Sequence, residues 1–115
     1  MVKDIVFQTK ELAKAIKKSN EYNQYQRIRQ TLKKDMELFD RVQELRKRNF
    51  ELQSRTDISD MFEEIERLNS EFSEIMKMPV VNEFLMAEQR LCKMMQEVYS
   101  SLSDGLDFEL GFLEK

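Results

Sequence analysis

Apolar residues recur along this chain at intervals of three and four positions, which is the spacing of an amphipathic helix. The pattern covers residues 3–18, 21–53 and 58–76, and it resumes after Pro79. Charged residues fill the intervening positions, and only two Gly and one Pro are present to interrupt helices. We therefore predict an all-α fold, an elongated antiparallel bundle of about four helices with one long central helix.

Two positions mark where helices should begin. Ser19 and Asn20 are good N-cap residues, so a second helix is predicted to start directly after them. Pro79 fixes its own φ angle and loses no needed hydrogen bond in a first helical turn. We expect Pro79 to end the helix before it and to begin the last one.

The second helix is predicted to continue unbroken to about Gln53, because neither glycine nor proline occurs within it. At about 1.5 Å per residue it would span roughly 50 Å, longer than a compact chain of this length allows. Such a helix leaves apolar surface uncovered by its own chain. A second copy related by a two-fold axis is the simplest cover, so we predict a homodimer or a higher symmetric oligomer.

The composition disfavours catalysis and metal binding. Histidine is absent and Cys92 is the only cysteine, whereas structural zinc and iron–sulfur sites take about four Cys or His ligands. Nearly all carboxylates fall at outward helical positions, away from the apolar setting that separates the pKa values of an acid and a base. We predict no catalytic residue, no metal site and no cofactor.

Two residues of the last helix are exceptions to its apolar stripe. Cys92 falls among apolar positions and is expected to be buried as a small apolar residue. Glu88 lies within the same stripe as a charge. It is expected to reach solvent at a helix seam or to pair with a basic residue of the first half of the chain.

The C-terminal residues change period, because residues 106–112 alternate apolar with polar or glycine positions. The expected arrangement is a terminal segment laid over the bundle, and the alternatives are a frayed end or a docking strand for another protein. We predict a single helical domain at 1–106 and a tail at 107–115. Neither a leader-like segment nor an apolar stretch of about 20 residues is present, so a cytoplasmic protein without membrane contact is expected.

Basic residues recur at intervals of seven along the second helix and just beyond it, namely Arg27, Lys34, Arg41, Arg48 and Arg55. On a continuous helix they would drift by only about 20° per step and share one face. Arg41 and Arg48 are expected to project away from the stripe of Leu32, Met36 and Phe39. The set is either a solvated face, a partner-binding surface for another protein, or a track for a nucleic-acid backbone. Neighbouring acidic residues and a pI near 5.2 favour a protein over nucleic acid.

The charge is distributed unevenly along the chain. Residues 1–57 carry 14 Lys and Arg against 9 Asp and Glu, whereas residues 58–115 carry 5 against 13. The net charge of −3 therefore conceals halves of +5 and −8. This polarity either lets two helical layers attract each other or offers a basic surface to an acidic partner.

Several segments together resemble the YlbF/YmcA family of small bacterial helical regulators, from the first helix to about Leu106. The residues that carry the resemblance are Leu12, Ala13 and Ile16, then the run Ser19-Asn20-Glu21-Tyr22-Asn23-Gln24-Tyr25, Asp35, and above all Pro79-Val80-Val81-Asn82-Glu83-Phe84-Leu85-Met86-Ala87-Glu88-Gln89.

The resemblance implies an all-helical, dimer-forming regulatory protein without enzymatic activity. Members of the family include subunits of a complex that promotes competence, sporulation and biofilm formation by modulating an endoribonuclease and mRNA maturation. In some of those subunits C-terminal cysteines help to hold iron–sulfur clusters, but residues 107–113 contain none here. The expected function is that of a non-catalytic interaction protein, and the alternative is a factor that binds RNA or DNA through the basic stripe.

Overall fold

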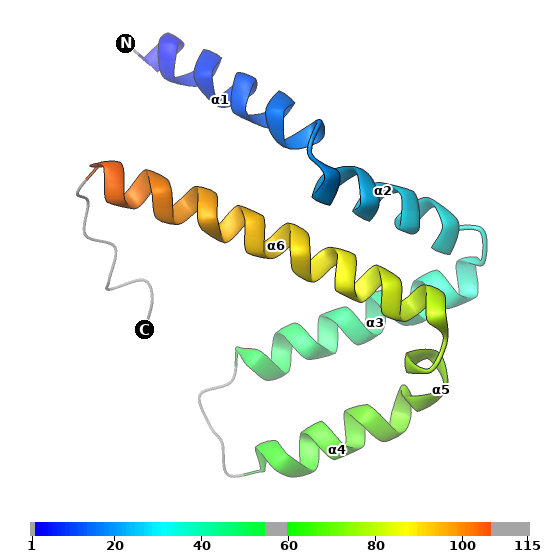
Figure 1. The fold of residues 1–115 in the computed structure, drawn as a ribbon. Coiled ribbons are helices and arrows are strands. Elements are labelled where there is room, and N and C mark those ends of the chain that lie inside the picture. Colours follow the sequence, from blue (N-terminus) through cyan, green and yellow to red (C-terminus); the bar gives the residue numbers. More distant parts are fainter. Residues whose placement is uncertain (1, 55–59, 107–115) are drawn as a thin grey trace. The chain divides into compact units, whose positions relative to one another are not determined.

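The computed structural model describes residues 2–54 and 60–106, and every regular element within them is a helix (Figure 1). The helices are α1 (Val2–Lys17), α2 (Asn20–Leu32), α3 (Met36–Gln53), α4 (Met61–Glu71), α5 (Ser73–Met76) and α6 (Pro79–Leu106). The all-α prediction is confirmed. The predicted tail at 107–115 lies outside the described residues.

Two predicted helix starts are confirmed. The Ser19 hydroxyl accepts a hydrogen bond from the Tyr22 backbone N–H at 3.2 Å, so Ser19 caps α2. Pro79 is the first residue of α6, and the backbone N–H groups of Val81 and Asn82 donate to the Met78 carbonyl at 3.1 Å. Proline therefore occupies the first turn, where its missing N–H costs no hydrogen bond.

The prediction of one long helix over residues 21–53 is wrong. The chain turns after Leu32, where the N–H groups of Lys34 and Asp35 donate to carbonyls three residues earlier at 3.2 Å. Asp35 then caps α3, because its carboxylate accepts a hydrogen bond from the Leu38 N–H at 3.2 Å. A short acidic side chain that satisfies a free backbone donor ends one helix and starts another without glycine or proline.

Replacement of Asp35 by alanine is expected to lower the free energy of unfolding by about 1 kcal/mol, because the cap bond to Leu38 is lost. Urea unfolding followed by circular dichroism measures the change. Asp35→Asn, which can still cap, is the matched control and should keep most of the stability. Equal losses in the two variants would show that the cap does not stabilise α3.

The predicted third helix is also divided, because α4 ends before Phe72 and α5 begins after it. Phe72 leaves helical geometry, with φ −107° and ψ 14°, and its N–H donates to the Leu68 carbonyl at 3.1 Å. The Phe72 side chain is almost completely buried, with 1% of its surface exposed. The break thus lies at a core residue, which the periodic pattern does not reveal.

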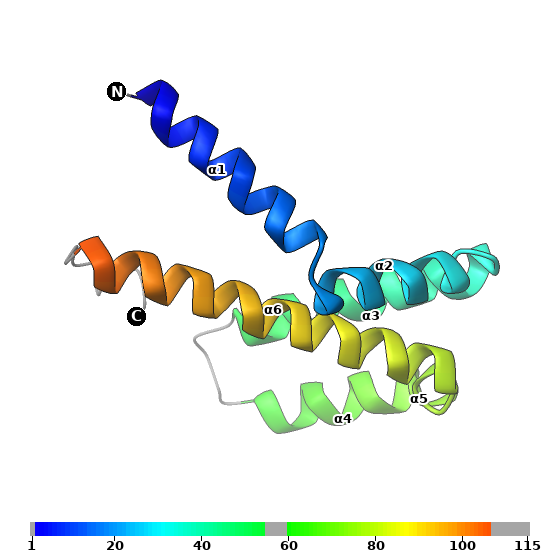
Figure 2. The same cartoon turned by 45° about the horizontal axis from the view of Figure 1, so that its top comes forward.

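The chain forms two units, one of residues up to Tyr25 together with those from Met86 onward, and the other of Gln26–Leu85. In the Gln26–Leu85 unit, α3 and α4 lie side by side and antiparallel (Figures 1 and 2). Leu45, Leu68 and Phe72 form a core cluster there. The partly buried residues packed against this cluster are Leu52, Ile75, Met76 and Leu85. The single domain at 1–106 stays a prediction.

Within the described residues, no helix combines the length and the hydrophobicity that crossing a bilayer requires.

Candidate interaction surface

The five basic residues spaced by seven do not lie on one helix. Arg27 lies on α2, Lys34 lies in the turn that follows, and Arg41 and Arg48 lie on α3. Arg55 lies outside the described residues. Because the chain turns between residues 32 and 36, the seven-residue spacing does not place these cations on one continuous face.

Arg41 and Arg48 were expected to project away from the stripe of Leu32, Met36 and Phe39. The apolar group that they meet is another one, the ring of Phe72 in the core of the Gln26–Leu85 unit. Their guanidinium carbons lie 4.3 and 5.4 Å from the centre of the Phe72 ring. Arg41 donates to the Glu71 backbone carbonyl at 3.2 Å and to the Glu44 carboxylate at 2.6 Å. A guanidinium is flat and weakly hydrated, so it stacks on an aromatic face while its edge makes hydrogen bonds.

Arg48 and Glu71 form the ion pair that joins α3 to the end of α4. The hydrogen bond from Arg48 holds the pKa of Glu71 below its usual range, and the same bond raises the pKa of Arg48. Both side chains remain partly exposed, at 33% and 43%, so solvent and salt screen their attraction. The pair therefore orients the two helices more than it stabilises them.

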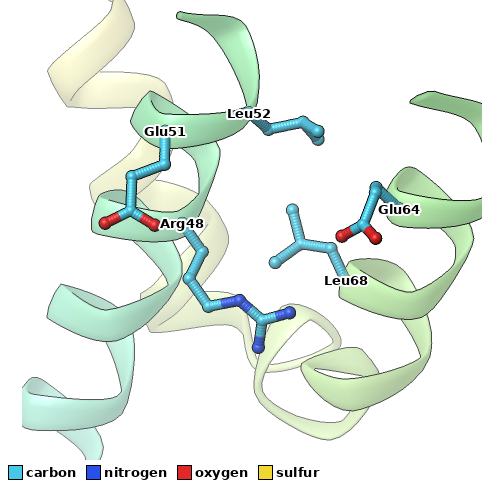
Figure 3. Close-up of a pocket in the computed structure, with 5 residues that line it drawn as sticks. All are labelled: Arg48, Glu51, Leu52, Glu64 and Leu68. Carbon is cyan, nitrogen blue, oxygen red and sulfur yellow. The ribbon is translucent and has the colours of Figure 1, made fainter. Parts of the chain in front are cut away.

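A shallow cleft of about 170 Å³ lies between α3 and α4 beside this pair (Figure 3). Leu52 and Leu68 point toward each other across it, and Glu64 faces it from α4. Arg48 and Glu51 complete the lining. The cleft is small and its floor is formed by the packing of α3 against α4, so we interpret it as part of the contact between these helices.

Four basic residues gather at the end of α2 and in the following turn: Arg27, Arg29, Lys33 and Lys34, here called the α2 basic cluster. No acidic residue occurs between positions 22 and 34. Arg27 and Lys34 are exposed. The cations of Arg29 and Lys33 lie over the Phe39 ring, 5.9 and 5.6 Å from its centre, within the range of a cation–π contact.

Arg29 and Lys33 do not follow the seven-residue spacing, so that spacing did not predict them. The signal that could have found them is the stretch of 12 residues from Asn23 to Lys34 that contains four cations and no acidic residue. A local excess of one charge depends on neighbouring positions only, so it survives a break in the helix.

The structure shows different degrees of exposure for Cys92 and Glu88, the two exceptions in the apolar stripe of α6. Cys92 is exposed, so the expectation that it is buried is wrong. Its neighbours Leu91 and Met95 are half-buried, and a difference of one position turns a side chain by about 100° around the helix. Glu88 is half-buried. Among the described residues, no three His, Cys, Asp or Glu side chains converge in a way that could hold a metal ion.

The described residues form helices and no other regular element, which is the architecture of an all-α protein. The family model described as "Control of competence regulator ComK, YlbF/YmcA" matches residues 5–107. The chain belongs to this regulatory family.

Two curated relatives are both described as UPF0342 proteins. The one from Caldicellulosiruptor bescii is 27% identical over 114 residues, which cover 91% of this chain and 92% of the relative. The one from Symbiobacterium thermophilum is 29% identical over 106 residues, which cover 88% of this chain and 92% of the relative. No solved structure matches the chain.

Proposed function

We propose that this protein is a non-catalytic regulatory subunit that acts by binding another protein, with the α2 basic cluster as its principal polar contact. The observation that carries the proposal is the exposure of Arg27 and Lys34 in a stretch without acidic residues, on a chain with a net charge of −3. Like charge concentrated in one place on an acidic protein steers an acidic partner to that place.

Arg41 and Arg48 have a smaller part in this proposal. Their guanidinium groups are engaged with Phe72 and Glu71, so they add to the positive field around α3 but offer few free donors. The partner-binding role of Arg55 stays a prediction.

The family supports a more specific proposal about the pathway. The description of the family names control of a competence regulator. We therefore infer that the protein forms a homodimer and joins other regulatory proteins in a complex that controls competence, sporulation or biofilm formation, by modulating mRNA processing. The alternative is direct binding of RNA or DNA by the α2 basic cluster.

Charge reversal in the double variant Arg27→Glu/Lys34→Glu is expected to reduce partner recovery at least tenfold in affinity capture from native extract. The matched control is Lys47→Glu/Lys77→Glu, which makes the same change in net charge at two other exposed positions. The control should recover the wild-type set of proteins. Equal recovery with the Arg27 and Lys34 variant would refute the assignment of this surface.

Nuclease treatment and salt distinguish the alternative function. Binding to a phosphate backbone weakens steeply with salt, because each neutralised phosphate releases a counterion. A protein interface with an apolar centre weakens less. Capture that disappears after nuclease treatment of the wild-type extract would favour the nucleic-acid function.

A further inference from the structure

Exposed apolar side chains gather at one end of the α3–α4 pair, where α3 ends and α4 begins (Figure 1). Phe50 and Phe62 expose 71% and 73% of their surface, more than any other phenylalanine that the structure describes. Ile65 beside them exposes 41%. Single exposed apolar residues are common on protein surfaces, but several large ones in one place are typical of a binding surface.

A hollow of about 390 Å³ lies between α3 and α4 at this end. Its lining consists of Asn49, Leu52 and Gln53 from α3 and of Met61 and Ile65 from α4. These five residues, together with Phe50 and Phe62, are here called the hairpin groove. All of them belong to the Gln26–Leu85 unit. An apolar floor with a few amide groups is the usual lining of a site that binds an apolar group in a fixed orientation.

Phe50 and Phe62 lie along the two sides of the hairpin groove. Phe50 precedes Gln53 by three positions on α3, and Phe62 precedes Ile65 by three positions on α4. Residues three apart are neighbours on a helix surface, so each ring borders the lining of its own helix. Aromatic side chains and methionine are enriched at the centres of protein interfaces. The groove therefore offers two aromatic sides and a flexible methionine to an apolar helix face.

The edge of the groove along α4 is acidic. Residues 61–66 contain three glutamates and no cation. Glu64 forms an ion pair with Arg67 at 2.9 Å, whereas Glu63 and Glu66 are exposed next to Phe62. On the α3 side, the exposed residues Lys47 and Glu51 carry opposite charges. The negative charge is thus concentrated along one edge of an apolar groove.

We propose that the hairpin groove binds an amphipathic helix of another protein. The apolar face of that helix packs between Phe50 and Phe62, and its basic residues lie along the edge that carries Glu63 and Glu66. An amphipathic helix in an apolar groove is a common mode of peptide recognition, and charges of opposite sign at the rim fix its orientation.

The charge of the groove argues against two other occupants. Residues 107–115 of the chain itself carry three acidic residues against one lysine, so Glu63 and Glu66 would repel them. An anionic lipid surface would be repelled for the same reason. The groove also differs in sign from the α2 basic cluster, so the two surfaces select partners of opposite charge. The proposal therefore does not rest on the function assigned to that cluster.

Fluorescence anisotropy with a labelled synthetic peptide tests the groove. The probe is a peptide of about 18 residues with leucine at three- and four-residue spacing and lysine elsewhere, so that it forms a basic amphipathic helix. The wild type should bind this probe about tenfold or more tightly than the same peptide with glutamate in place of lysine.

Loss of the two aromatic sides should abolish most of this binding. Phe50→Ala/Phe62→Ala is expected to weaken binding of the lysine peptide about tenfold or more, because the apolar anchors of an interface carry most of its affinity. The matched control is Met36→Ala/Met78→Ala, which shortens two exposed apolar side chains elsewhere in the same unit. The control should bind like the wild type, and circular dichroism checks that each variant is folded.

Charge reversal at the acidic edge should change the preference between the two peptides. Glu63→Lys/Glu66→Lys is expected to weaken the lysine peptide about tenfold and to strengthen the glutamate peptide. Asp40→Lys/Glu74→Lys makes the same change in net charge at two other exposed positions. This control should keep the wild-type preference.

Four results would overturn the proposal. Unchanged binding in Phe50→Ala/Phe62→Ala would place the peptide elsewhere, and equal weakening by the two charge-reversal variants would mean that net charge alone holds it. Binding that becomes about tenfold tighter after removal of residues 107–115 would make the chain's own C-terminal residues the occupant. A smaller sedimenting mass of Phe50→Ala/Phe62→Ala would make a second copy the occupant. Capture by the α2 basic cluster is a separate measurement, so it still decides the proposed function.

Discussion

Replacement of Phe72 by alanine is expected to lower the free energy of unfolding by about 3–5 kcal/mol. The Phe72 side chain exposes 1% of its surface and packs with Leu45 and Leu68 in the core cluster. Its removal leaves a cavity between α3 and α4, and it also removes the ring on which Arg41 and Arg48 stack. Urea unfolding followed by circular dichroism measures the change.

Phe62 supplies the control for this experiment. It is the same residue type on α4, but it exposes 73% of its surface. Phe62→Ala should therefore stay within about 0.5 kcal/mol of the wild type. Similar losses in the two variants would mean that Phe72 does not lie in the core.

Charge reversal in the double variant Arg41→Glu/Arg48→Glu is expected to lower the melting temperature by several degrees. The variant loses the hydrogen bond to the Glu71 carbonyl, the ion pair with the Glu71 carboxylate and both contacts with the Phe72 ring. It also places new negative charges beside Glu71 and Glu44. Thermal unfolding compares it with Arg27→Glu/Lys34→Glu, which has the same net charge and should melt like the wild type. Identical melting of both double variants would refute the structural role of Arg41 and Arg48.

The difference in melting temperature between the wild type and the double variant Arg41→Glu/Arg48→Glu should become smaller at acid pH. The pKa of Glu71 is lower in the folded protein, through its hydrogen bond with Arg48. The contribution of Glu71 is therefore fully present above the unfolded glutamate pKa of about 4.3, and it is lost as the pH falls through the lower folded value. Melting curves from neutral pH down to about pH 3 test the sign. High salt should also reduce this difference in melting temperature, because Arg48 and Glu71 are partly exposed and salt screens their attraction.

The same pair of double variants separates fold from function. The Arg27 and Lys34 variant is expected to keep its stability and lose its partner, whereas the Arg41 and Arg48 variant is expected to lose stability. If the Arg41 and Arg48 variant fails to bind the partner at a temperature where the variant remains folded, Arg41 and Arg48 have a direct role in binding.

The helix starts at Ser19 and Pro79 could be predicted because the deciding contacts are local. The Ser19 cap bond spans three residues, and Pro79 acts through its own φ angle. Asp35 is equally local, yet its cap was missed because the apolar spacing continues across it. The exposed positions of Arg27 and Lys34 follow from the sequence, whereas Arg29 and Lys33 required attention to charge density.

The sequence by itself determined an all-helical chain, the boundaries at Ser19 and Pro79, and the apolar stripes of α1 and α6. Only the tertiary structure decided the roles of Arg41, Arg48 and Phe72. Arg41 and Arg48 both form hydrogen bonds with Glu71, which lies 30 positions after Arg41 and 23 positions after Arg48 in the sequence. Helical periodicity places a residue on a face of its own helix, but it does not state which distant side chain covers that face. The packing of α3 against α4 converted two apparently free cations into a contact between helices.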